Sequence, residues 1–176
     1  LEIDLHAGDF LENTPAASTQ ARDEQAMETR PGTQIGAWEV VRRIGRGGMG
    51  EVLEVRRADG QYEMRAALKR LHEDGKEHVD RLARERQILA ALRHPNIAAL
   101  LDGGVDDDGR PWMVMEYVKG ETLDRWADGK TLPARLAVFR QVVEAINHAH
   151  GQLVIHRDIK PANILVDANG HAQLLD

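Results

Sequence analysis

One short segment holds five polar side chains of types that do chemistry: His156, Arg157, Asp158, Lys160 and Asn163. Apolar residues precede and follow the segment, so it is predicted to be a polar loop between two ordered elements. At average amino-acid frequencies, the pattern H-R-D-x-K-x-x-N would occur by chance in a chain of this length on the order of once in ten thousand. The pattern therefore indicates a site of chemistry, and a surface loop that is polar by coincidence is the weaker interpretation.

A second segment is a glycine-rich turn with the pattern G-x-G-x-x-G-x-V, which runs through Gly45, Arg46, Gly47, Gly48, Met49, Gly50, Glu51 and Val52. Without a Cβ, the backbone of such a turn can approach phosphate oxygens with its N–H groups unobstructed. The turn is therefore a candidate phosphate-binding loop, although a hairpin that needs glycines only to turn fits it as well. A dinucleotide site is disfavoured, because a strand and not a helix follows the glycines.

A charged pair is predicted between Lys69 and Glu85. Lys69 ends a predicted strand, on the same face as Ala67. Glu85 follows Leu82 by three residues and lies within the apolar stripe of a predicted helix. An inward-turned carboxylate needs a cationic partner to offset its desolvation, typically several kcal/mol, and Lys69 is the natural candidate. The alternatives are a solvated lysine and a glutamate at the edge of its stripe.

The elements that position these residues follow from hydrophobic periodicity. Alternation predicts five strands, over residues 38–44, 52–55, 62–68, 97–101 and 112–118. In the first strand, Trp38, Val40 and Ile44 are expected on one face. An acidic turn over 106–109 joins the last two strands.

Helical spacing predicts one helix over 78–92 and another over 133–150. The second helix carries an apolar stripe of Leu136, Phe139, Val143 and Ile146. A short hairpin over 164–175 turns at Asn169 and Gly170. Strands with one helix, followed by a helix, a polar loop and a hairpin, suit two unlike halves that meet at a cleft.

Composition excludes several classes of protein. The net charge of -6 and the pI near 5.8 argue against sequence-independent binding of nucleic acid or of an anionic membrane. The chain has no cysteine, so neither disulfides nor thiolate metal sites can form. No apolar run approaches the ~18 residues needed to cross a bilayer. Residues 1–34 have no sustained period and are predicted to be a disordered linker or the tail of an upstream segment.

Taken together, the glycine-rich turn, the strand lysine, the H-R-D-x-K-x-x-N loop and a following aspartate resemble the protein kinase family. The variants Ala66-Ala67-Leu68-Lys69 and His94-Pro95-Asn96-Ile97 most resemble bacterial serine/threonine kinases of eukaryotic type. The resemblance covers roughly residues 36–176. It implies an α+β, two-lobe kinase fold, with the N-lobe and hinge over 35–118 and part of the C-lobe over 119–176.

The resemblance also implies a nucleotide site for ATP. Gly45, Gly47 and Gly50 would cover the phosphates, within a turn that includes Arg46, Gly48 and Met49. The residues that would sandwich adenine are Ile44, Val52, Ala67 and Leu165. Glu116 and Val118 would offer backbone groups to the adenine edge, behind Met115 as gatekeeper. Lys69, oriented by Glu85, would hold the α- and β-phosphates.

For the transfer itself, the resemblance assigns the remaining polar residues. Asp158 would accept or orient the proton of the substrate hydroxyl, and Lys160 would neutralise charge on the γ-phosphate. Lys160 also favours Ser and Thr hydroxyls over Tyr. Asn163 would bind Mg²⁺, or Mn²⁺ in its place, together with Asp176, which lies thirteen residues after Asn163.

Asp176 is the last residue, so the resemblance implies that the activation loop and the substrate-binding helices are absent. We therefore expect residues 1–176 alone to be inactive and the apolar stripe of the helix over 133–150 to be exposed. The expected partners are ATP and proteins with Ser or Thr acceptors, with no nucleic acid and no membrane contact within this segment. A cytoplasmic kinase domain is expected, in a protein that could be anchored to a membrane through other segments.

Two alternatives come from other classes of protein. A pseudokinase, acting as a nucleotide-binding or scaffold module, usually lacks one of the residues that here are all present: Lys69, Asp158, Asn163 and Asp176. A small-molecule kinase of the same fold, such as an aminoglycoside phosphotransferase, is disfavoured by Lys160 and by the glycine-rich turn.

Overall fold

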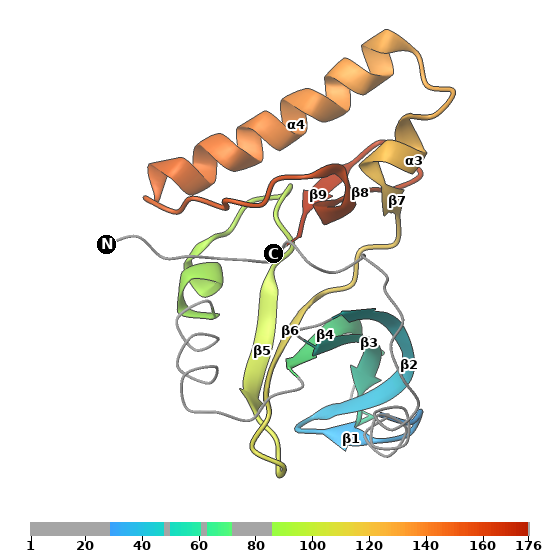
Figure 1. The fold of residues 1–176 in the computed structure, drawn as a ribbon, viewed down its shortest axis with the longest axis vertical. Helices are drawn as coiled ribbons and strands as arrows, with labels where there is room; N and C mark the ends of the chain where they lie inside the picture. Colours follow the sequence, from blue (N-terminus) through green and yellow to red (C-terminus); the bar gives the residue numbers. More distant parts are fainter. Residues whose placement is uncertain (1–28, 48–49, 61–62, 72–85, 176) are drawn as a thin grey trace, which may run out of the picture.

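The computed structural model describes residues 29–47, 50–60, 63–71 and 86–175. They form two parts, a six-stranded sheet and a smaller part that contains the long helix α4 (Figure 1). The large sheet is antiparallel, with the strand order β1-β2-β3-β4-β6-β5. Its strands are β1 (Gln34–Ile35), β2 (Trp38–Gly47), β3 (Gly50–Arg57), β4 (Arg65–Leu71), β5 (Leu100–Val105) and β6 (Pro111–Glu116).

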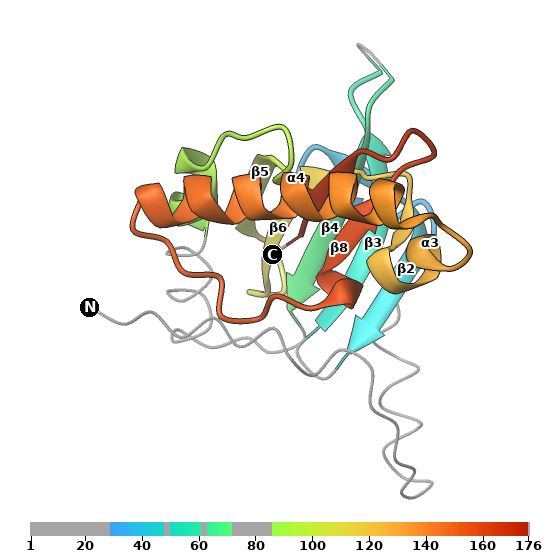
Figure 2. The same cartoon turned by 90° about the horizontal axis from the view of Figure 1, so that it is seen from above.

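The second part is built around a three-stranded sheet of order β7-β8-β9. Its elements are β7 (Glu121–Thr122), α3 (Leu123–Ala127), α4 (Leu132–Gly151), the 3₁₀ turn η1 (Pro161–Asn163), β8 (Ile164–Val166) and β9 (Ala172–Leu174). Seen from above, α4 lies across this small sheet, with β8 beneath it (Figure 2). The predicted helix and terminal hairpin are thus confirmed. Residues 86–91, in the C-terminal half of the other predicted helix, are helical, and residues 78–85 lie outside the described ranges.

The six-stranded sheet has two different faces, because neighbouring side chains on a strand point to opposite sides. The core face is apolar and buried, and includes Trp38, Leu53, Leu68 and Val114. The other face, here called the lysine face, carries the alternate residues, which cross-strand register aligns as Val52, Glu54, Ala67, Lys69, Met113 and Met115. The predicted placement of Lys69 on the side of Ala67 is confirmed.

Two β-strand predictions were shifted along the chain. The strand predicted over 62–68 is β4, which begins at Arg65, and the strand predicted over 97–101 is β5, which begins at Leu100. Ile97 instead makes an isolated parallel bridge to Leu174 in the second part of the molecule. An apolar alternation marks burial on one side but does not say which partner supplies it. The acidic turn at 106–109 is confirmed, since Gly109 N–H donates to Asp106 O at 3.0 Å.

The prediction that Ile44 shares a face with Trp38 and Val40 is wrong. Trp38 and Val40 are buried in the core face, whereas Ile44 is 40% exposed. The pairing of β2 with β3 shifts twice, between Val40 and Arg42 and between Arg43 and Gly45. Each shift adds one unpaired residue to β2 and reverses the alternation from that point.

The sheet also begins earlier than composition suggested. Gln34 lies in β1 and pairs with Glu39, and Gly32 N–H donates to Val40 O at 2.8 Å. Thr29 is buried, where its hydroxyl contacts the Glu51 carboxylate and accepts a hydrogen bond from Arg70 Nη1 at 3.0 Å. Residues 29–33 therefore pack against the sheet through polar contacts and backbone hydrogen bonds, and Gln34 begins its first strand.

The two parts are joined at Asn96 as well as through the segment after β6. The buried Asn96 side chain donates to Ala172 O at 2.7 Å and to Gln141 Oε1 in α4 at 2.9 Å. Leu174 N–H donates to Asn96 O, and Ala98 N–H donates to Leu174 O. These hydrogen bonds fix the segment that leads into β5 against β9 and α4.

Candidate active site

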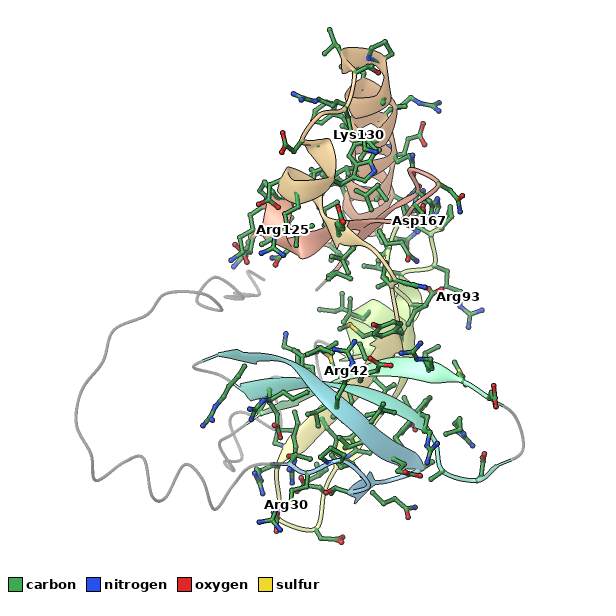
Figure 3. The ribbon with its side chains drawn as sticks, turned by 90° about the vertical axis from the view of Figure 1, so that its right-hand side faces the viewer. Arg30, Arg42, Arg93, Arg125, Lys130 and Asp167 are labelled. Carbon is green, nitrogen blue, oxygen red and sulfur yellow. The ribbon has the colours of Figure 1, made fainter. Side chains whose placement is uncertain are left out.

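Lys69 lies on the lysine face of β4, where it is only 9% exposed. Val52 in β3 and Met113 in β6 are its cross-strand neighbours, and Ala67 lies across from Met115. Four predicted nucleotide-site residues therefore share the lysine face: Val52, Ala67, Lys69 and Met115. Figure 3 labels Arg42, which pairs with Glu54 of this surface, on the side of the sheet that faces the helical part.

The glycine-rich turn closes the hairpin between β2 and β3, and Gly47 pairs with Gly50. A Cβ on Gly50 would lie 2.2 Å from Arg70 O, so this position accepts no side chain without moving the backbone of β4. Gly50 is therefore required by strand packing, whatever the turn binds. Gly48 and Met49 lie outside the described residues, while Gly45 and Arg46 are in β2.

The hinge is the segment that leaves β6 at Glu116. Glu116 N–H donates to Ala99 O at 2.9 Å, and the Glu116 side chain accepts a hydrogen bond from Gln173 Nε2 at 3.2 Å. Met115, the predicted gatekeeper, is buried beside Leu89 and Leu100. Val118 follows the strand and is half-buried.

Leu165 lies in β8 of the second part, across from Gln173, whose side chain contacts Glu116 of the hinge. Its neighbours in β8, Ile164 and Val166, are buried under α4 and α3, so alternation turns Leu165 to the opposite side of the small sheet. Leu165 is half-buried there.

The polar loop gathers its three predicted residues around one carboxylate. Asn163 Nδ2 donates to Asp158 Oδ2 and to Asp158 O, both at 2.9 Å, and Lys160 Nζ lies 3.2 Å from Asp158 Oδ2. Because the amide nitrogen of Asn163 is committed to Asp158, its amide oxygen is the atom left to face a ligand. Carboxylate and amide oxygens are the ligands that Mg²⁺ prefers, so this set of donors fits that ion.

His156 ties this loop to the end of the hairpin. Asp158 N–H donates to His156 Nδ1 at 3.3 Å, which makes Nδ1 an acceptor in the neutral ring. Nε2 then carries the proton and donates to Leu175 O at 3.0 Å. Leu175 N–H also donates to Asn163 O at 2.8 Å. Arg157 adopts a left-handed backbone, with φ of 63°, that lets the chain turn sharply between these contacts.

Two further predicted residues of this site, Glu85 and Asp176, also lie outside the described residues, as Gly48 and Met49 do. The predicted Lys69–Glu85 pair and the second Mg²⁺ ligand stay predictions.

Two hollows in the described part of the chain border residues of the polar loop and the hinge. An apolar hollow of about 40 Å³ lies beside His156, between Leu89 and Ile146. A wider hollow of about 760 Å³ lies behind the hinge, bordered by Arg93, Glu116 and Gln173. Neither of these two hollows is lined by Val52, Ala67, Lys69 or Leu165.

Sequence reasoning overlooked Glu54, a carboxylate with no exposed surface on the lysine face. A signal for it was present, since Glu54 alternates with Val52 on a strand that was predicted correctly. A charged residue two positions from an adenine-site residue faces the same side of the strand.

Comparison with known proteins gives concordant results. The family model described as "Protein kinase domain" matches residues 38–176. The chain is 40% identical over 147 residues to serine/threonine-protein kinase PrkC of Bacillus subtilis, covering 80% of this chain and 22% of PrkC. It is 36% identical to PknF of Mycobacterium tuberculosis, covering 30% of that protein. The chain thus spans less than a third of these curated relatives.

Solved structures agree with the sequence relatives. The PknI kinase domain of Mycobacterium tuberculosis superposes with a TM-score of 0.68 at 32% sequence identity. The match covers 85% of this chain and 62% of that one.

Proposed function

The chain belongs to the protein kinase family and has its two-lobe fold, and on this basis we propose that it carries the nucleotide and catalytic site of an ATP-dependent serine/threonine kinase. Such an enzyme transfers the γ-phosphate of ATP to a Ser or Thr hydroxyl of a protein. The observation that carries the proposal is the loop in which Lys160 and Asn163 both contact the Asp158 carboxylate. The relatives described above are named serine/threonine kinases, which supports the choice of acceptor.

Phosphoryl transfer asks a protein mainly to align nucleophile and phosphate and to neutralise charge. We assign Asp158 to orient the acceptor hydroxyl and take its proton, and Lys160, 3.2 Å away, to balance the charge that develops on the transferred phosphate. Lys69, on the buried lysine face, would contact the α- and β-phosphates. Because Lys160 and Asn163 both contact Oδ2 of Asp158, the direction of the whole carboxylate is fixed before substrate binds.

The adenine ring would lie between Val52 and Ala67 of the sheet and Leu165 of β8. Ile44, more exposed, would border its edge. Glu116 and Val118 would provide the backbone groups of the hinge. This assignment is supported by the alternation that turns Val52, Ala67 and Leu165 away from the two hydrophobic cores.

Kinases of this family generally use ATP with Mg²⁺, and we propose that Asn163 and Asp176 would hold the ion here. The metal would supply charge neutralisation on the phosphates. Protein acceptors and a cytoplasmic location are parts of the same proposal. No described helix is both long and apolar enough to span a bilayer.

The test is transfer of labelled γ-phosphate from ATP by the full-length protein, with Mg²⁺, to a generic protein acceptor. Phosphoamino acid analysis is expected to yield phosphoserine or phosphothreonine. Binding of ATP without transfer would favour the pseudokinase alternative. Label on an aminoglycoside and none on protein would favour a small-molecule kinase.

A further inference from the structure

Glu54 is a buried carboxylate that the proposed chemistry does not use. Its side chain has no exposed surface, and it lies on the lysine face of β3, two residues from Val52. Ala67 of β4 is its cross-strand partner, and Ala67 in turn lies across from Met115. Glu54 therefore occupies the same row of the sheet as Ala67, which is proposed to border adenine, and Met115, the predicted gatekeeper.

Two arginines reach Glu54 from the strands on either side. Arg42 of β2 places Nη2 2.7 Å from Oε2, and Arg65 of β4 donates from Nε to Oε1 at 2.7 Å and contacts the same oxygen with Nη2. No described group makes a well-directed hydrogen bond to Oε2, so Arg42 acts there mainly through its charge. Burial alone would raise the pKa of Glu54, but Arg65 and Arg42 lower it, which keeps the carboxylate ionised at neutral pH.

The same two arginines also contact the hinge. The Arg65 guanidinium lies 5.1 Å from the centre of the Tyr117 ring, a cation–π distance, and Arg42 Nη2 lies 3.4 Å from the Tyr117 hydroxyl. Tyr117 stands between Glu116 and Val118, the residues proposed to meet the adenine edge. One carboxylate thus links β2, β3 and β4 to the hinge through two cations.

We propose that Glu54 is a positioning residue for adenine recognition. Glu54 holds Arg42 and Arg65 in place, and these two arginines fix Tyr117. The distance between the hinge backbone and the sheet residues Val52 and Ala67, which would border adenine, is set in this way. The side chains of Arg42 and Arg65 are more than half exposed, and without an anchor they would sample other directions in solvent. This inference rests on the proposed function, because it assumes that adenine binds at this hinge.

The decisive variant is Glu54→Met in the full-length protein. Replacing a buried, paired charge by an apolar side chain of similar size is often neutral for stability, so the variant is expected to fold. Displacement of a fluorescent ATP analogue would give the affinities of adenosine and of inorganic tripolyphosphate separately. We expect adenosine to bind about tenfold more weakly, because displacing a contacting group by ~1 Å lowers affinity by this factor or more. The affinity for tripolyphosphate is expected to be unchanged.

Glu39→Gln is the matched control. It removes the Arg56–Glu39 ion pair, at 2.7 Å on the neighbouring part of β2 and β3, without touching the hinge, and should leave both affinities unchanged. Tyr117→Leu is the second variant, since it breaks the tie while leaving Glu54 paired. Tyr117→Leu should lower the affinity for adenosine and leave the affinity for tripolyphosphate unchanged. If Glu54→Met does not fold, this variant tests the positioning role.

The outcomes separate the two proposals. Equal loss of both ligands, or unchanged adenosine affinity in a folded Glu54→Met or Tyr117→Leu variant, would overturn the positioning role while leaving the kinase assignment intact. Failure of the unsubstituted protein to bind ATP would overturn the proposed function and this inference with it.

Discussion

The Asp158 carboxylate is held by two neighbours in its own loop, Lys160 at 3.2 Å and Asn163 at 2.9 Å. Both contacts involve Oδ2, and we propose that Oδ1 receives the acceptor hydroxyl. A base needs to be within hydrogen-bond reach of its proton and held still there. At this scale the site is a single carboxylate whose direction is set by a cation and an amide.

Asp158→Asn is expected to reduce the rate of transfer by about 10²- to 10⁴-fold, the usual worth of a positioned base, with ATP affinity nearly unchanged. Labelled-phosphate transfer and fluorescent nucleotide binding measure the two effects. Asp107→Asn, at an exposed turn residue, should change neither. Full activity in Asp158→Asn would exclude Asp158 as the base.

The lowered pKa of Glu54 predicts an acid-sensitive contribution to folding. When a carboxyl's pKa is lower in the folded state, its stabilisation is complete above the ordinary value, about 4.3, and is lost as pH falls through the lowered value. In urea unfolding, Glu54→Met should have a free energy of unfolding close to that of the unsubstituted chain at neutral pH, because an apolar side chain of similar size replaces a buried, paired charge. Below about pH 4 the unsubstituted chain should lose stability relative to Glu54→Met, which has no carboxyl to protonate, while Arg42 and Arg65 stay charged throughout. Parallel curves down to pH 3 would contradict this.

Among the elements, the hairpin of β2 and β3 does most to shape the nucleotide side of the site. It brings the glycine-rich turn to the end of the lysine face, and its two register shifts expose Ile44. The missing Cβ of Gly50 lets β3 approach the backbone of β4 at Arg70. The position of the turn thus depends on close contact between strands as well as on freedom to bend.

Gly50→Ala is expected to destabilise the protein by about 1–3 kcal/mol, because the new methyl group would overlap Arg70 O and force the strands apart. ATP affinity should fall with it, as the turn moves. Thermal unfolding and nucleotide binding measure both. Gly151→Ala, at the end of α4 with open space around it, should be neutral or slightly stabilising. Equal melting temperatures for the two variants would show that the strands accommodate the methyl group.

In the molecule as a whole, the two parts meet through the hinge and through the hydrogen bonds of Asn96, and α4 lies on the outer side of the second part (Figure 1). The helix buries Val138, Val142, Ala145 and Ala149. The apolar stripe predicted from the sequence follows the buried residues by one position along the chain, as Phe139 follows Val138 and Val143 follows Val142. One position corresponds to about 100° around the helix. Leu136, Phe139 and Val143 are consequently 56%, 62% and 45% exposed, as expected from the sequence, whereas Ile146 of the same stripe is half-buried and packs against the core beneath α4.

Because contiguous exposed apolar side chains favour association, residues 1–176 are expected to self-associate at micromolar concentration. Sedimentation velocity would detect the larger species. The double variant Leu136→Ser and Phe139→Ser should shift the chain toward monomer, whereas Arg140→Ser, at an already polar and exposed position, should not. A monomeric unsubstituted chain over the same concentrations would contradict the prediction.

The amino-acid sequence was enough to predict the family, the polar loop and the alternation that places Val52, Ala67 and Lys69 on one face. These depend on residue type and on short-range period, which a single chain displays directly. It also predicted the hairpins and the long helix, whose signals are local.

The partners of these elements, in contrast, could be identified only from the three-dimensional contacts. Ile97 pairs with Leu174 instead of continuing a strand, the shifts in β2 expose Ile44, and Glu54 joins two arginines and Tyr117. Each of these features depends on contacts between residues far apart in the chain. Such contacts depend on the packing of the complete fold, so the local periodicity of the sequence does not predict them.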